Sequence, residues 1–176
     1  MTESELRQHR CCFTGHRPER LPWGRREGDP RCAALKRKLY AAVNAAYESG
    51  MRYFICGMAR GSDFYFAEAV LALQEKYPDV QLEAAVPYPG QASRWSEEDQ
   101  ARWRRLLAAC SRQTMVQRHY SRLCMIRRNQ YMVDRSALVI AVYDGQEGGG
   151  TRNTLEYAIR QKVPFVDIDP HEAEEP

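Results

Sequence analysis

The chain has 176 residues, of which 44% are hydrophobic and 28% charged, and its formal net charge is +3. This length and composition are typical of one globular domain with a buried core, and the small net charge does not by itself indicate a nucleic-acid partner. No apolar run approaches the roughly 18 residues of a transmembrane helix, and residues 1–10 lack the apolar core of a signal peptide. We therefore expect a cytoplasmic protein with no membrane partner.

Cysteine and histidine do not form a pattern that would hold a metal ion. The six cysteines contain no CxxC pair and no zinc spacing, and the four histidines are scattered. Several cysteines lie in apolar runs, where this side chain packs as a small hydrophobe. We expect reduced thiols, no metal and no cofactor.

Predicted strands and helices alternate along the chain. After a disordered start over residues 1–9, the pattern predicts strands at Arg10–Thr14, Arg52–Cys56, Val80–Val86, Gln113–Gln117, Ala137–Tyr143 and Pro164–Ile168, and helices at Cys32–Ser49, Phe64–Tyr77, Glu97–Cys110, Ser121–Asp134 and Thr151–Gln161. This alternation indicates a single doubly wound parallel α/β sheet flanked by helices, over residues 10–168, with an acidic tail over 169–176. In the predicted helix Ser121–Asp134, Ile126 and Val133 are expected to face inward, and Arg127 and Arg128 fit a solvated face.

A glycine turn follows the second strand, at the kind of junction where open α/β sheets bind small ligands. Gly57 and Gly61 would let backbone N–H groups approach a ligand, Ser62 or Asp63 can cap the helix, and the positive helix N-terminus suits a phosphate. Arg60 would add a guanidinium, whereas Asp63 fits better as an acceptor for ribose hydroxyls. The alternative interpretation is that the glycines only form a tight turn and Asp63 only caps the helix.

Two more turns should meet this one, because a parallel sheet places all its strand carboxyl ends along one edge. Their candidate ligand-binding residues are Thr14, Gly15, His16 and Arg17 after the first strand, and Gly149, Gly150 and Thr151 after the fifth. They supply a hydroxyl, open backbone, positive charge and a second helix N-terminus for a phosphate. Each turn also has a purely structural interpretation. His16 would be a surface histidine, the loop Gly148–Gly150 would be flexible, and Glu156 would form a capping box with Asn153.

These motifs together resemble the YpsA-like family. Thr14–Pro18 is similar to the TGHRP opening of that family, Gly57–Asp63 and the helix after it to its central block, and Arg128–Asp134 to a third motif. The resemblance covers about residues 11–168. It implies a Rossmann-like fold of the SLOG superfamily, shared with the DNA-processing protein DprA and the LOG-type hydrolases, and a nucleotide site. Gly61 and Asp63 match that family's ligand-site glycine and acidic residue.

The hydrolase motif of the LOG-type relatives, PGGxGTxxE, is matched only loosely. If Thr154 occupies the place of the motif threonine, Asn153 replaces a glycine and Tyr157 stands where the glutamate should be. Glu156 is then one residue out of place, on another face of the helix. Glu156 and Asp63 remain as candidate catalytic carboxylates, with no reaction assigned to either.

Three functional hypotheses follow. The first is a binding or sensor protein for a nucleotide or a nucleotide-derived ligand, such as an ADP-ribose-like or signalling nucleotide. The alternative is a hydrolase that cleaves the N-glycosidic bond of a nucleoside monophosphate. A DprA-like single-stranded DNA binder ranks last, because Trp95 and Trp103, which would stack on bases, belong to one surface helix or its start. Self-association is expected only by analogy with SLOG relatives.

Overall fold

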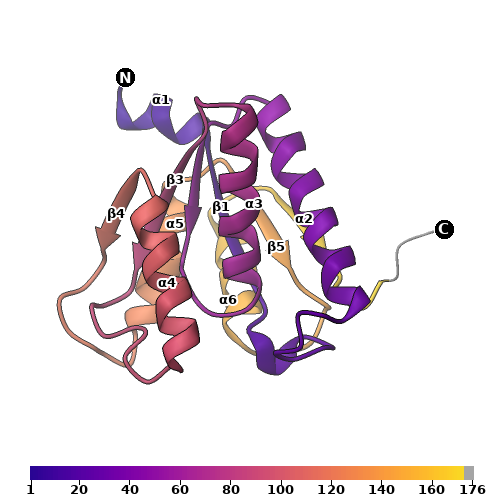
Figure 1. The fold of residues 1–176 in the computed structure, drawn as a ribbon. Coiled ribbons are helices and arrows are strands. Elements are labelled where there is room, and N and C mark those ends of the chain that lie inside the picture. The colour runs from indigo at the N-terminus through magenta and orange to yellow at the C-terminus, as the bar shows by residue number, and fades with distance from the viewer. Residues whose placement is uncertain (173–176) are drawn as a thin grey trace.

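The computed structural model, which describes residues 1–172, contains a six-stranded parallel sheet with helices on both faces (Figure 1). The strands are β1 (Arg10–Gly15), β2 (Tyr53–Cys56), β3 (Gln81–Val86), β4 (Arg112–Met115), β5 (Leu138–Val142) and β6 (Phe165–Ile168). The helices are α1 (Glu3–Gln8), α2 (Pro30–Glu48), α3 (Ser62–Lys76), α4 (Glu97–Ala109), α5 (Cys124–Asp134) and α6 (Gly150–Arg160), with a short 3-10 helix, η1 (Pro18–Arg20). The predicted Rossmann-like α/β sheet is confirmed. Within the described residues, no helix is both long and apolar enough to cross a membrane.

The two ends of the chain differ from the expectation or lie outside the described part. Residues 1–9 were expected to be disordered, but α1 forms there. Its N-cap Thr2 accepts a hydrogen bond from the Glu5 backbone N–H, and the Glu5 side chain accepts one from the Thr2 N–H. This capping box satisfies two N–H groups that a short helix would otherwise leave unpaired. Of the predicted acidic tail over 169–176, residues 173–176 lie outside the described residues.

The strand order β4-β3-β2-β1-β5-β6 places the two halves of the sheet on either side of β1. The chain proceeds outward from β1 to β4 and then returns to the opposite side of β1 to form β5 and β6. Helices α2, α3 and α4 cover one face, and α5 and α6 cover the other (Figure 1). The loops after β1 and β5 therefore lead to opposite faces, and such a reversal opens a crevice at the carboxyl edge of the sheet.

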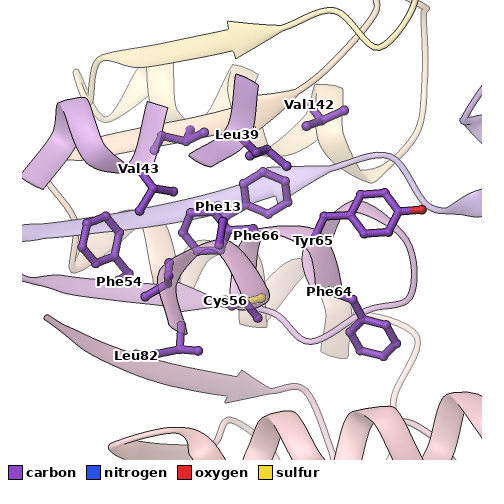
Figure 2. Packing of buried hydrophobic residues seen from close by; sticks show 14 of the residues in the cluster. Phe13, Leu39, Val43, Phe54, Cys56, Phe64, Tyr65, Phe66, Leu82 and Val142 are labelled. Carbon is purple, nitrogen blue, oxygen red and sulfur yellow. The ribbon is translucent and has the colours of Figure 1, made fainter. Parts of the chain in front are cut away.

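Successive side chains of β1 point to opposite faces of the sheet, so this strand contributes to both layers of the core. Phe13 packs toward α3, where its ring stacks on Phe66 at 4.6 Å between centroids, with Phe54 close by (Figure 2). Cys12 faces the other layer, formed with α5 and α6. Both faces of β1 are fully buried, so the loop that follows this strand starts from a rigid support.

The inner face of α5 is not the one expected. Val133 is buried as predicted, but Ile126 is 43% exposed. The buried stripe runs instead through Cys124, Arg128 and Met132, which are four residues apart and therefore lie on one side of the helix. The fifth helix thus carries an arginine toward the sheet, at the edge where the loops converge.

Candidate functional site

A cavity of about 370 Å³ lies at the carboxyl edge of the sheet, between the loops after β1, β2 and β5 and helix α5. Of the predicted site residues, eight line it: Thr14, Gly15, His16, Arg17, Asp63, Gly149, Gly150 and Thr151. The others, Gly57, Arg60, Gly61, Ser62 and Glu156, do not line this cavity. The structure therefore brings the three predicted turns to one place. Of the five residues predicted in the turn after β2, only Asp63 lines the cavity.

His16 joins the three turns. Its backbone N–H donates to the Val142 carbonyl (3.2 Å), and its own carbonyl accepts hydrogen bonds from the Ser62 N–H (3.2 Å) and hydroxyl (2.6 Å). Its ring Nε2 lies 2.9 Å from Oδ1 of Asp144, and both side chains are 2% exposed. His16 is thus a buried connector between the turns rather than a surface histidine.

Asp144 is held in its ionised form at the end of β5. Burial raises the pKa of this carboxyl, but hydrogen bonds from the Gln146 N–H (3.1 Å) and from His16 outweigh that effect. The pKa of Asp144 therefore lies below its ordinary value of 3.8. An ionised carboxylate only accepts hydrogen bonds, so the contact with Oδ1 favours the His16 tautomer with its proton on Nε2, and the Asp144 backbone N–H lies 3.4 Å from the same nitrogen.

Gly61 allows the second turn to pack directly against the first. Its φ is +85°, and a Cβ at this position would lie 2.9 Å from Cδ of Pro18 and 3.1 Å from the His16 carbonyl. The N-cap of α3 is Gly61 itself, so neither Ser62 nor Asp63 caps the helix as predicted. The His16 carbonyl accepts from the Ser62 N–H at the N-terminus of α3, so this terminus is not open to a phosphate as predicted.

Asp63 is a buried carboxylate in the cavity wall. Its Oδ2 accepts a hydrogen bond from the Ala59 N–H at 2.9 Å, and the residue is 6% exposed. Burial raises the pKa of Asp63, and the positive charge of Arg128 opposes this rise. Within residues 1–172 no hydrogen bond to Oδ1 is formed, so this oxygen can accept one from a ligand.

Arg128 approaches the same space from α5 and is 4% exposed. Its Nη1 donates to the Gly57 carbonyl, and its Nε donates to Oδ1 of Asn129 at 2.8 Å. Burial lowers the pKa of Arg128, whereas the nearby Asp63 raises it. Gly57 leaves room for the guanidinium, because a Cβ there would lie 2.6 Å from Cζ of Arg128.

The N-terminus of α6 is the open one. Gly149 is its N-cap and makes no side-chain cap, and Gly150 and Thr151 belong to the first turn. The backbone N–H groups of a first turn have no acceptor inside the helix and carry a partial positive charge. The predicted capping box does not form, because the helix starts earlier and Glu156 instead accepts from Nε of Arg152 at 2.9 Å.

Three arginines line the cavity: Arg17, Arg20 and Arg128. Arg20 donates to the Gly148 carbonyl at 3.0 Å. Arg17 is exposed, and within residues 1–172 no hydrogen bond or ion pair holds its side chain. The predicted cation Arg60 points elsewhere, since its guanidinium lies over the Trp95 ring at 5.2 Å.

Sequence reasoning missed Arg20, Arg128 and Asn129, all of which line the cavity. A signal for Arg128 was present, because it is spaced by four residues from both Cys124 and Met132. An arginine in the middle of an apolar stripe indicates a buried charge with a specific partner. Arg20 lies in a charged loop and carries no such signal.

The chain is similar to known bacterial proteins over most of its length. A model of the YspA SLOG family matches residues 11–168. The uncharacterized SPbeta prophage-derived protein YoqJ of Bacillus subtilis (strain 168) is 32% identical over 143 residues, which are 74% of this chain and 83% of that protein. A UPF0398 protein of Bacillus pumilus is 24% identical over 156 residues, 88% of this chain and 81% of its own length.

Two solved structures of DprA share the fold. The protein from Streptococcus pneumoniae matches with a TM-score of 0.58 and 14% identity, over 92% of this chain and 50% of its own. The protein from Helicobacter pylori, described for its single-stranded DNA binding mode, matches with a TM-score of 0.60 and 12% identity, over 94% of this chain and 66% of its own. The chain thus spans half of the first DprA chain, and at these identities the likeness shows the fold alone.

Proposed function

The chain belongs to the YspA SLOG family, and from this premise we propose that it binds a nucleotide or a nucleotide-derived ligand that carries a phosphate, in the cavity at the carboxyl edge of the sheet. The observation that supports this most is the open N-terminus of α6 facing the same cavity as three arginines. Backbone N–H groups and guanidinium groups are the donors that recognise phosphate in proteins.

Each part of the cavity would contact a different part of such a ligand. The N–H groups of Gly150 and Thr151 and the unpaired Arg17 bind the phosphate. Asp63 accepts a hydrogen bond from a sugar hydroxyl through the oxygen that Ala59 does not use. Burial raises the pKa of this carboxyl, and the positive charge of Arg128 opposes that rise. The cavity volume of about 370 Å³ is in the range of small-molecule sites.

Binding fits the geometry better than hydrolysis of a glycosidic bond. Glu156, the candidate nearest to the hydrolase glutamate in sequence, is paired with Arg152 and does not line the cavity. Asp63 already accepts a hydrogen bond from the Ala59 N–H, so only one of its two oxygens is left for a ligand. Incubating the protein with AMP, and measuring free adenine, tests the hydrolase: sustained release at a rate proportional to enzyme would favour it.

Single-stranded DNA is a second candidate ligand, because two solved structures with this fold are DprA proteins and one of them is described for its single-stranded DNA binding mode. Trp95 and Trp103, the aromatic residues expected to stack on bases, give this candidate little support. Trp103 donates to Gln91 at 3.1 Å, Trp95 lies against Phe64 and Arg60, and both pack against the hydrophobic core. Binding of an oligonucleotide that weakens steeply with salt would support this candidate.

Isothermal titration calorimetry with AMP, ADP-ribose, adenosine and inorganic phosphate tests the proposal directly. We expect binding of the compounds that carry both a phosphate and a sugar, and much weaker binding of adenosine. A ligand at about 100 times its Kd should also raise the free energy of unfolding by about 2.7 kcal/mol. Absence of binding by every phosphate-bearing compound at millimolar concentration would refute the proposal.

A further inference from the structure

We propose that the groove between α5 and α6 is the subsite for the base of a nucleoside monophosphate whose phosphate and sugar occupy the cavity described above. This inference rests on the proposed function and adds the class of ligand and its orientation. It is carried by a second cavity, the wall residues that this cavity shares with the first, and the chemistry of those residues.

The second cavity has a volume of about 240 Å³. Helix α5 contributes Met125, Ile126 and Asn129 to its wall, and α6 contributes Asn153, Glu156 and Tyr157. Met125, Asn129 and Gly150 line both cavities. The two cavities are therefore adjacent at the first turn of α6, where the phosphate is expected to bind.

The groove has the chemistry that a base requires. Met125, Ile126 and the half-buried Tyr157 give it an apolar and aromatic wall. The Tyr157 hydroxyl donates to Oδ1 of Asp134 at 2.7 Å, which ties the side chain of α6 to α5 and keeps the ring in place. A flat heterocycle has apolar faces that pack on such side chains, and polar edges that hydrogen-bond to amides.

Asn129 marks the boundary between the two subsites. Its Oδ1 accepts from Nε of Arg128, and since a guanidinium only donates, the identity of this oxygen is fixed. Both hydrogens on Nδ2 then point away from Arg128, and within residues 1–172 neither of them forms a hydrogen bond. An amide donor that is oriented but unpaired, at the passage between a phosphate site and an apolar groove, is suited to an acceptor on the sugar or base.

The arrangement predicts that the base adds affinity beyond that of the sugar phosphate. AMP would fill both cavities, whereas ribose 5-phosphate would fill only the first. Burying the faces of the base should strengthen binding about tenfold or more, which corresponds to roughly 1.4 kcal/mol or more. A site limited to the first cavity would bind the two compounds with equal affinity.

Calorimetry with AMP and ribose 5-phosphate, on the wild type and two matched variants, tests this arrangement. Ile126→Glu places a carboxylate in the groove, and Ile159→Glu makes the same change on α6 at a position that lines neither cavity. Both residues are exposed, at 43% and 61%, so both variants should fold, and thermal melts check this. We expect Ile126→Glu to remove most of the preference for AMP without changing the affinity for ribose 5-phosphate, and Ile159→Glu to change neither.

The outcomes separate this inference from the proposed function. Equal affinities of the wild type for the two compounds, or a loss of both compounds in Ile126→Glu, would overturn the base subsite and leave the phosphate site standing. Failure of the wild type to bind either compound, together with ADP-ribose, GMP, CMP and UMP, would overturn the proposed function and the subsite with it.

Discussion

Nη1 of Arg128 donates a hydrogen bond to the backbone carbonyl of Gly57, so a buried guanidinium from α5 lies directly against the turn that follows β2. The two residues are 71 positions apart in the chain. Their contact links the helices of one face of the sheet to a loop that leads to the other face, beside Asp63 and the cavity.

Gly57→Ala should destabilise the protein by about 1–3 kcal/mol, the usual cost of overpacking a well-filled site. The added Cβ would lie 2.6 Å from Cζ of Arg128, and the guanidinium cannot move without breaking its bonds to Gly57 and Asn129. Urea denaturation measures the cost. Gly28→Ala is the control, because a Cβ there meets no atom within 4 Å.

A double-mutant cycle identifies the cause of that cost. Arg128→Met removes the guanidinium and should itself be strongly destabilising, since it breaks a buried charged contact. In that background Gly57→Ala should cost much less than in the wild type, because its main steric partner is gone. If Gly57→Ala costs the same in both backgrounds, the contact with Arg128 is not the reason for the glycine.

Gly61→Ala should cost more than Gly145→Ala, although the two glycines have φ values of +85° and +82°. Both substitutions force an alanine into a left-handed backbone conformation. Only Gly61 is also packed, against Pro18 and the His16 carbonyl, whereas a Cβ on Gly145 meets nothing within 4 Å. Equal losses in the free energy of unfolding would show that backbone strain alone explains Gly61. We expect Gly61→Ala to lose more free energy of unfolding than Gly145→Ala and to bind nucleotide more weakly, because the loop that carries His16 and Arg17 must shift.

Arg17→Met should weaken binding of AMP by roughly ten- to a hundredfold, the range expected for losing a charge-assisted hydrogen bond of about 1.5–3 kcal/mol. The variant should keep the wild-type stability, since no ion pair or hydrogen bond within residues 1–172 involves this side chain. Arg26→Met is the matched control: Arg26 is also exposed but does not line the cavity. Equal losses of affinity in the two variants would point to a general charge effect instead of a contact.

The sequence was sufficient for the sheet and for the meeting of the three turns at one edge of it, and the reasons are local. Alternating apolar strands and helices determine the parallel sheet, and a glycine turn after a strand must lie at the carboxyl edge. For that reason Thr14, Asp63 and Gly150 were correctly expected to be neighbours. The start of the chain was not predicted, because a six-residue helix depends on the capping box of Thr2 and Glu5 more than on apolar periodicity.

The distribution of roles within the site could not be predicted, because it depends on long-range packing. Two strand–glycine–helix junctions look alike in sequence, but the His16 carbonyl fills the N-terminus of α3 and leaves that of α6 open. Arg60 and Arg128 are also alike as residues, and only the fold directs the first onto Trp95 and the second toward Gly57. Which helix terminus and which arginine face a ligand is therefore a tertiary property.

The stability of the protein at acidic pH should depend on Asp144. Its pKa in the folded state is lowered below 3.8, net of burial, by hydrogen bonds from Gln146 and His16. A lowered pKa means that the ionised carboxylate adds to the free energy of unfolding fully above about pH 5, and that this contribution is lost as the pH falls through 3.8 and then through the lower folded-state value. Asp144→Asn removes the titrating group, and its asparagine can still accept a hydrogen bond from His16.

Urea denaturation from pH 7 to pH 3 measures this effect. We expect Asp144→Asn to be less stable than the wild type at pH 7, and the difference between the two proteins to shrink as the pH approaches 3. Asp167→Asn is the control, because Asp167 is exposed and no ion pair within residues 1–172 involves it. A difference between Asp144→Asn and the wild type that stays constant over this range would mean that Asp144 contributes by its shape and hydrogen bonds alone, and that its charge does not hold the loops of β1 and β5 together.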